Sequence, residues 1–189
     1  IAYLKAIPNL VIFAARDLVQ LRQILYTSQF IDQPIAIRYP RGRGFTKDWK
    51  LKFEKIPLGK AEQLKTGSKT ALIGVGSLLH QALKAIENTG QADKIACYDL
   101  RFIKPLDETC LHEIFKQYEE IICIEDGVIA GGLGESILNF AMQHQYKQKV
   151  HLMGIADEFP SHASVEELYK IHDLDKKAIK EKLLGILNR

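Results

Sequence analysis

Short apolar runs alternate along the chain with longer stretches in which apolar residues recur every three or four positions. The runs are rich in Ile and Val and have the length of buried strands, whereas the spaced stretches are typical of amphipathic helices. Strands are predicted at residues 9–13, 35–38, 60–64, 70–75, 95–100, 120–124 and 150–155. Helices are predicted after Asp17, Ser77, Pro105 and Gly131, and at residues 164–171 and 175–187. This alternation predicts an α/β fold with three layers, in which helices flank a mostly parallel sheet.

The first part of the chain forms a pattern of its own. Strand, helix and strand follow one another within residues 9–38, and this order predicts a βαβ unit with parallel pairing. Such a unit has little core by itself, so we expect it to belong to a larger sheet. The polar, irregular stretch that follows predicts division into a segment 1–45, a linker 46–58 and a domain 59–189. Ile1 in place of Met predicts that the chain begins within a longer protein.

Arginines gather in the turn that follows the strand predicted at residues 35–38. The chain reads Arg-Tyr-Pro-Arg-Gly-Arg-Gly from residue 38 to residue 44, and Pro40 fits a strand end because it has no N–H for a sheet ladder. A guanidinium can bind two phosphate oxygens at once, and ligands of open α/β sheets bind beyond the carboxyl ends of strands. We therefore predict a phosphate-binding turn that uses Arg41, with Arg38 in support. The alternative is a solvated basic loop that links two domains.

A glycine turn at residues 74–77 offers a different function. Gly-Val-Gly-Ser between a strand and a helix is similar to a dinucleotide fingerprint, and Asp99 lies near the place of the acidic ribose partner. Leu79 stands where the third glycine would be, and a side chain there hinders close packing of helix on strand. We favour a tight turn capped by Ser77 and keep a dinucleotide-binding or purely structural domain as the alternative.

A second glycine turn, at residues 131–134, also precedes a helix. Free amides at a helix start can hold an anion, but the Gly-Lys-Ser/Thr of a P-loop is missing. Glu125 and Asp126 lie just upstream, where their charge would repel phosphate. As neighbours on a strand they point to opposite faces and are not expected to act as a carboxylate pair. Close helix packing is the preferred interpretation of this turn.

Composition excludes few classes of function. Hydrophobic residues make up 47% and charged residues 26% of the 189 positions, and the net charge of +3 gives no reason to expect nucleic acid or a membrane. The three cysteines lack metal-ligand spacing and fit a reduced, cytoplasmic protein. The histidines have no metal spacing either, and no nucleophile stands beside a base, so no catalytic, cofactor-binding or metal residue is predicted.

Several motifs resemble, in the same order, the C-terminal portion of the 1-deoxy-D-xylulose-5-phosphate synthases, which are transketolase-like thiamine-diphosphate enzymes. The most specific are Arg-Tyr-Pro-Arg-Gly from residue 38 and Arg-Phe-Ile-Lys-Pro-Leu-Asp from residue 101. The others are Ile-Pro-Asn at 7–9, Glu-Asp-Gly at 125–127 and Gly-Gly-Leu-Gly at 131–134. The resemblance covers nearly the whole chain. It implies a transketolase C-terminal domain at 59–189 preceded by the end of the thiamine pyrimidine-binding domain at 1–45, and contact of Arg41 with the phosphate of the aldehyde acceptor.

The resemblance also implies an activity for the whole enzyme. Such a transferase joins pyruvate, with loss of CO2, to glyceraldehyde 3-phosphate for isoprenoid, thiamine and pyridoxal synthesis, and uses thiamine diphosphate and Mg²⁺. The cofactor-binding motifs of the family have no match here, so the chain alone is expected to bind no cofactor and to be inactive. The implied partners are the N-terminal part of the same protein and a second copy in a homodimer. Transketolase and the β chain of 2-oxoacid dehydrogenases are the related alternatives, and the motifs at 38 and 101 favour the synthase. Arg101 and Lys104, before Pro105, are expected at a domain interface.

Overall fold

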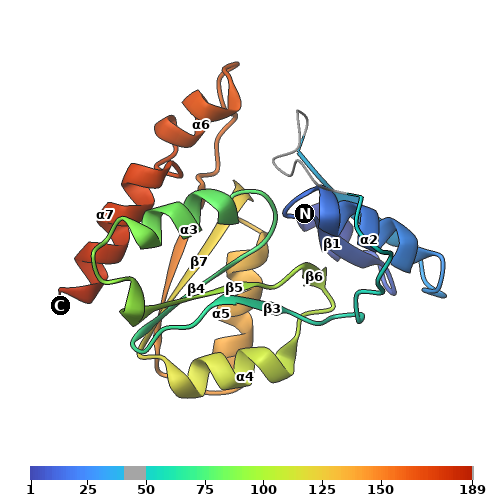
Figure 1. Cartoon of the computed structure of the whole chain (residues 1–189), viewed down its shortest axis with the longest axis horizontal. Coiled ribbons are helices and arrows are strands. Elements are labelled where there is room, and N and C mark those ends of the chain that lie inside the picture. Colours follow the sequence, from blue (N-terminus) through green and yellow to red (C-terminus); the bar gives the residue numbers. More distant parts are fainter. Residues whose placement is uncertain (41–49, 189) are drawn as a thin grey trace.

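A computed structural model describes the chain at residues 1–40 and 50–188, where it forms two sheets side by side (Figure 1). The strands in chain order are β1 (Val11–Ala14), β2 (Ile35–Arg38), β3 (Glu62–Lys65), β4 (Thr70–Gly74), β5 (Ile95–Asp99), β6 (Phe102–Lys104), β7 (Glu120–Val128) and β8 (Lys149–Ile155). The helices are α1 (Ala2–Lys5), α2 (Leu18–Ser28), α3 (Leu79–Glu87), α4 (Glu108–Gln117), α5 (Leu133–Gln143), α6 (Val165–Ile171) and α7 (Lys176–Leu187), with a 3₁₀ turn at Ala92–Lys94.

The larger sheet has the strand order β3-β5-β4-β7-β8, and all neighbours are parallel except the edge strand β3. Its two faces are both covered, as a parallel sheet requires. Along β7, Ile121 and Cys123 face the core shared with α4 and α5, whereas Ile122 and Ile124 face the core shared with α3 and α7. This alternation gives three layers and confirms the predicted fold class (Figure 1).

The smaller sheet has the order β2-β1-β6. The parallel pairing of β1 with β2 confirms the predicted βαβ unit. The third strand, β6, comes from the distant segment after β5 and runs antiparallel to β1. The sequence does not predict β6, because three residues between Arg101 and Pro105 are too few to show an alternation. Buried aromatic packing supports this pairing. The rings of Phe13 and Phe102 pack edge to face with their centroids 4.9 Å apart, and both side chains are fully buried.

Most helix starts follow from the sequence. Asp17, Asp107, Ser164 and Asp175 each accept a hydrogen bond from a main-chain N–H of the first turn and so satisfy a free donor there. The cap predicted at Ser77 is wrong, because α3 begins two residues later, at Leu79, without a side-chain cap. Gly76, at φ +72°, makes the turn and leaves Ser77 outside the helix.

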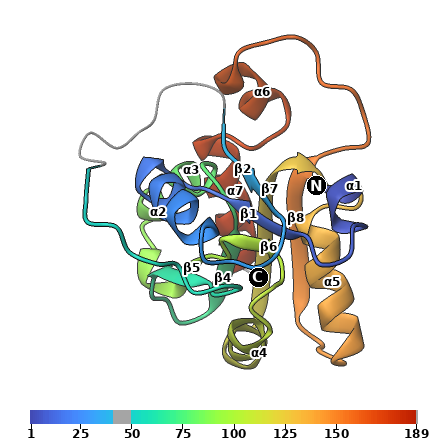
Figure 2. The same cartoon turned by 90° about the vertical axis from the view of Figure 1, so that its right-hand side faces the viewer.

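The βαβ unit β1-α2-β2, here called the N-terminal unit, lies against the ends of β4, β5 and β7 (Figure 2). Ile12 and Ala14 of β1, with Leu10 just before it, belong to the same buried cluster as Ile73 of β4 and Leu111 of α4. The unit thus obtains from β6 and from this shared core the burial that it lacks by itself.

Candidate functional site: the junction of the two sheets

The carboxyl ends of β4, β5 and β7 form the edge at which open α/β sheets bind their ligands. In this chain the N-terminal unit occupies that edge. The amide of Ala14 donates to the carbonyl of Arg101 just after β5, at 2.9 Å, and the turn after β4 lies beside Ala14 and Ala15. The candidate site is therefore a junction between two parts of the chain, and its polar groups fall into separate clusters.

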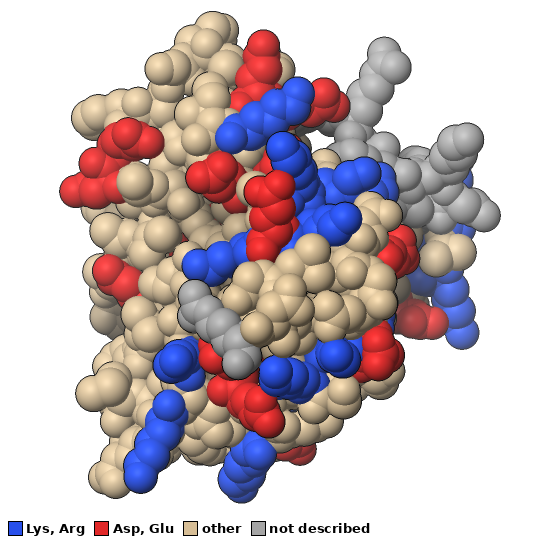
Figure 3. All heavy atoms as spheres, turned by 90° about the vertical axis from the view of Figure 1, so that its left-hand side faces the viewer, with Lys and Arg blue, Asp and Glu red and all other residues tan. Residues whose placement is uncertain are grey.

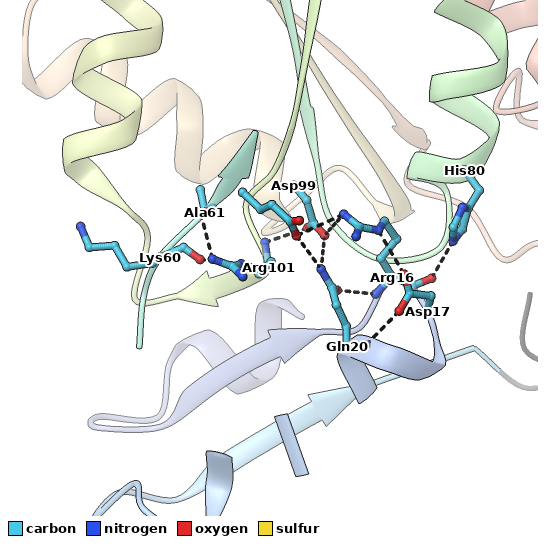
Figure 4. Close-up of polar contacts among 9 residues, drawn as sticks. Arg16, Asp17, Gln20, Lys60, Ala61, His80, Asp99 and Arg101 are labelled. Atoms are coloured by element: carbon cyan, nitrogen blue, oxygen red, sulfur yellow. Dashed lines mark hydrogen bonds and ion pairs between the residues drawn. The ribbon is translucent and has the colours of Figure 1, made fainter. Parts of the chain in front are cut away.

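The first cluster surrounds the carboxylate of Asp99 at the end of β5 (Figure 4). The Arg16 guanidinium donates to Oδ2 of Asp99 at 3.1 Å, and the Gln20 side-chain amide donates to the same oxygen at 2.8 Å. The main-chain N–H of Arg101 donates to Oδ1 at 2.9 Å. Glu62 of β3 also faces the cluster, with an oxygen 3.5 Å from Arg16. Both donors on the N-terminal unit therefore meet one buried acceptor on the larger sheet.

Burial sets the electrostatics of this cluster. The Asp99 side chain is fully buried, and this raises its pKa to about 6, against the opposing effects of the Gln20 hydrogen bond and the Arg16 charge. His80, whose Nε2 lies 3.2 Å from the carbonyl oxygen of Arg16, has its pKa lowered mainly by burial. The cluster keeps its charges only because they are paired.

The same geometry argues against a dinucleotide site. Both oxygens of Asp99 are already bonded within the protein, so neither is open to a ribose hydroxyl. Gly74 has no room to spare, since a Cβ built there lies 2.8 Å from Ile124 and 3.2 Å from Leu79. Gly76, where a pyrophosphate would approach, faces Ala14 of the N-terminal unit. The favoured interpretation, a tight structural turn, agrees with this packing.

The second cluster joins Arg38, the last residue of β2, to Asp126 of β7. One terminal nitrogen of the guanidinium donates to Oδ1 of Asp126 at 2.7 Å, and the other donates to the Asp126 carbonyl at 3.2 Å. The Arg38 side chain remains 36% exposed and that of Asp126 15%. The structure thus places Arg38 at the junction, while Arg41 lies outside the described residues.

The glycine turn at residues 131–134 holds a carboxylate of the protein itself. Glu125 accepts the N–H groups of Leu133 and Gly134, at 3.0 and 2.8 Å, and a Cβ on Gly132 would lie 2.4 Å from the Glu125 carboxylate. Burial raises the pKa of Glu125 despite these bonds. An internal anion fills the start of α5, and this confirms close packing rather than an external anion site. Glu125 and Asp126 also bind different partners, as the strand geometry predicted.

Lys5 ties α1 to the same turn. Its ammonium group donates to the carbonyls of Gly131 and Gly132, at 3.0 and 2.8 Å, and to the Ser136 hydroxyl at 2.5 Å. Burial lowers the pKa of Lys5. The chain before β1 is therefore anchored to the larger domain as well.

The Arg-Phe-Ile-Lys-Pro-Leu-Asp motif supplies the covalent link between the sheets. Arg101 donates to the carbonyls of Lys60 and Ala61, at 2.8 and 2.9 Å, and Lys104 reaches two carbonyls before β1. Asp107 caps α4 and accepts the N–H of Ala61 at 3.0 Å. The interface position expected for Lys104 agrees with its contacts before β1. The Arg101 side chain instead bonds to Lys60 and Ala61 of the larger domain, and only its main-chain carbonyl meets the N-terminal unit, at Ala14.

Other candidate chemistry is sparse in the part of the chain that the structure describes. Within residues 1–40 and 50–188, no group of three or more His, Cys, Asp or Glu side chains is arranged to hold a metal ion. The cysteines are free thiols, and burial raises the pKa of Cys110 to about 11, which disfavours a thiolate nucleophile. No described helix is long and apolar enough to span a membrane. The face that carries α6 and α7 shows acidic and basic side chains interspersed (Figure 3).

Comparison with known proteins decides the family. The family of the transketolase C-terminal domain matches residues 59–179. The chain belongs to this family. The match begins before β3 and ends within α7, so it takes in the whole larger sheet.

Curated relatives extend the similarity to the N-terminal unit. The 1-deoxy-D-xylulose-5-phosphate synthase of Phocaeicola vulgatus is 43% identical over 188 residues, which are 98% of this chain and 30% of the relative. The synthase of Bacteroides fragilis is 45% identical over 182 residues, which are 94% of this chain and 28% of the relative. The chain thus spans under a third of the length of the curated relatives that it matches.

A solved structure supports the fold of both units together. The protein titled "Split gene transketolase, inactive beta4 tetramer" superposes with a TM-score of 0.81 at 22% identity, over 99% of this chain and 60% of that one. The N-terminal unit and the larger sheet are therefore arranged as in that solved structure.

Membership of the transketolase family implies thiamine diphosphate in the full-length enzymes. This cofactor needs particular groups in its binding site. A diphosphate calls for free amides at a glycine turn or helix start, and its metal calls for oxygen ligands. The turn at 131–134 is filled by Glu125, and the turn at 74–77 is covered by Ala14 and Ala15. These residues do not fit the cofactor.

Proposed function

We propose that the chain is the C-terminal part of a 1-deoxy-D-xylulose-5-phosphate synthase, a transferase that joins pyruvate, with loss of CO2, to glyceraldehyde 3-phosphate. The observation that carries the proposal is identity of 43–45% with synthases of that name over 94–98% of the chain, on both sides of the junction. The names of these relatives favour the synthase over transketolase and over the β chain of 2-oxoacid dehydrogenases. The product would serve isoprenoid, thiamine and pyridoxal synthesis.

In this proposal the chain contributes to binding of the acceptor. Arg41 follows β2 by three residues and binds the phosphate of glyceraldehyde 3-phosphate through its guanidinium fork, while Arg38 supports the turn. Thiamine diphosphate, when bound with Mg²⁺ to the rest of the enzyme, supplies the carbanion chemistry. The chain alone would then bind no cofactor and be inactive.

The wider setting belongs to the same proposal. Residues 1–45 would complete the pyrimidine-binding domain, residues 46–58 would link the domains, and residues 59–189 would form the C-terminal domain. The enzyme would be a cytoplasmic homodimer, a location that suits the free cysteines. It would interact with neither nucleic acid nor membranes.

The test is Arg41→Ala in the full-length enzyme. One charge-assisted hydrogen bond to phosphate is worth about 1.5–3 kcal/mol, so kcat/KM for glyceraldehyde 3-phosphate should fall by about ten- to a hundredfold. The kcat/KM for unphosphorylated glyceraldehyde and the KM for pyruvate should stay unchanged. Arg41→Lys should restore part of the loss, because it returns the charge without the fork.

Arg43→Ala provides the matched control, since it removes an arginine from the same turn. Unchanged use of glyceraldehyde 3-phosphate by Arg41→Ala would refute the phosphate-binding role. No formation of 1-deoxy-D-xylulose 5-phosphate by the unaltered full-length enzyme would refute the synthase itself.

A further inference from the structure

The guanidinium of Arg38 lies against residues of the larger domain. Asp126 of β7 accepts from both of its terminal nitrogens. A Cβ built on Gly76, in the turn after β4, lies 3.6 Å from one of them. Tyr169 of α6 lies near enough to be affected: burial and the Asp126 charge raise the pKa of its hydroxyl, whereas a hydrogen bond with Ser77 and the Arg38 charge lower it. Three separate elements of the C-terminal domain thus lie beside one side chain of the N-terminal unit, which remains 36% exposed.

The ion pair with Asp126 makes Arg38 a weaker candidate phosphate ligand than an unpaired arginine. Each terminal nitrogen gives one N–H to Asp126 and keeps another, but the Asp126 carboxylate would repel a phosphate dianion brought close to the same guanidinium. Arg38 therefore differs from an arginine that has no partner in the protein and is available to bind an anion. Its bonds serve to fix a position.

The position that Arg38 fixes is the end of β2. Its carbonyl accepts the N–H of Ala15 at 2.9 Å, and its residue pairs with Ala14 as the last register position of the β1–β2 ladder. The ladder holds the main chain of Arg38 from one side, and Asp126 holds its side chain from the other. The arginine-rich stretch follows this doubly held residue directly in the sequence.

We propose that Asp126, in the C-terminal domain, is a positioning residue for the acceptor phosphate: it holds Arg38 and thereby fixes the point from which the turn with Arg41 starts. This inference rests on the proposed function. Asp126 touches neither substrate nor cofactor in this scheme and acts through Arg38 alone. The C-terminal domain would thus contribute to substrate binding across the junction of the two sheets.

The test compares Asp126→Ala and Asp126→Asn in the full-length enzyme with two acceptors. Loss of one charged contact that acts indirectly should lower kcat/KM for glyceraldehyde 3-phosphate by roughly three- to tenfold, mainly through KM. Unphosphorylated glyceraldehyde should be used as before, and the KM for pyruvate should not move. Asp126→Asn, which keeps an oxygen acceptor but loses the charge, should lie between Asp126→Ala and the unaltered enzyme.

A double-mutant cycle with Arg38→Met isolates the pair. If Asp126 acts through Arg38, the double variant Arg38→Met/Asp126→Ala should be no worse than Arg38→Met alone. Asp157→Asn, at an exposed carboxylate after β8, is the matched control and should leave both acceptors unaffected.

Several outcomes would overturn the inference. Additive effects would show that Asp126 does not act through Arg38, and improved use of glyceraldehyde 3-phosphate by Asp126→Ala would make Arg38 a phosphate ligand held back by Asp126. Equal losses with both acceptors, together with a lower Tm, would reduce Asp126 to a structural role. Arg41→Ala measured in parallel separates the failures. If Arg41→Ala behaves as expected and Asp126→Ala has no effect, only the inference about Asp126 fails. If Arg41→Ala has no effect, the proposed phosphate site fails.

Discussion

Two arginine–aspartate pairs join the same two parts of the molecule, yet they differ in surroundings. Arg16 and Asp99 have side chains that are 14% and 0% exposed, with Gln20 and a main-chain N–H as further partners. Arg38 and Asp126 are 36% and 15% exposed and bond mainly to each other. One pair lies within the packed junction, and the other lies at its rim beside the turn proposed to bind phosphate.

The difference in burial suggests a difference in role. Removing one partner of a buried ion pair leaves the other charge buried and unpaired, and this is strongly destabilising. An exposed ion pair contributes little to stability. We therefore expect the Arg16–Asp99 pair to hold the two sheets together and the Arg38–Asp126 pair to set a position. Changes at the first pair should affect unfolding, and changes at the second should affect use of the acceptor.

The largest effect is expected for Arg16→Met. The substitution keeps an apolar stem but leaves the fully buried Asp99 carboxylate with only neutral donors, and we expect a loss of about 3 kcal/mol in the free energy of unfolding at pH 7. Urea unfolding of the 189-residue chain measures it. Adding Asp99→Asn should recover much of the loss, because the unpaired charge is then gone. A loss below about 1 kcal/mol would place this pair in the same class as a surface ion pair.

The second-largest effect is expected in the pH dependence of stability, to which Asp99 contributes. Its pKa is about 6 in the folded chain and 3.8 for an exposed carboxyl, so between these values the folded state holds more protons than the unfolded state. The contribution of Asp99 to stability is therefore full below pH 4 and is lost as the pH rises through 6, by roughly 2–3 kcal/mol in total. Asp99→Asn should remove this component, as urea unfolding at pH 4, 5, 6 and 7 would reveal. An unchanged slope would assign the pH dependence to other groups.

The smallest effect on stability is expected for Arg38→Met. Because the pair is partly solvated, we expect less than about 1 kcal/mol from this matched Arg-to-Met substitution. The same urea titration measures it beside Arg16→Met. Equal losses at the two arginines would remove the distinction between a holding pair and a positioning pair.

The sequence predicted the larger sheet well because its strands are local signals. Runs such as residues 121–124 are continuous and apolar, and Asp17 and Asp175 stand where helix caps belong. The prediction failed where the deciding contact was distant in the chain. Strand β6 exists because Phe102 packs on Phe13, and Asp99 is paired because Arg16 lies across the junction. Neither partner carries a local pattern that indicates the other.

The candidate site was predictable to a similar degree. The arginine-rich turn stood out by its composition, and the start of α5 was correctly interpreted because Glu125 lies close upstream. Asp126 as the partner of Arg38 was missed, because they are 88 positions apart. The available signal was the position of Asp126 near the end of a predicted strand, at the sheet edge that the end of the strand with Arg38 approaches.

Hydrogen exchange of the 189-residue chain tests the central claim most directly, namely that the N-terminal unit is built into the junction rather than resting on it. The amide of Ala14 in β1, bonded to the carbonyl of Arg101, should open with the same free energy as amides of β4 and β5, to within about 1 kcal/mol. In Arg16→Met the protection of all three strands should fall together. If Ala14 exchanged about a thousandfold faster than β4 in the unaltered chain, the two sheets would open independently and the account of the junction would be wrong.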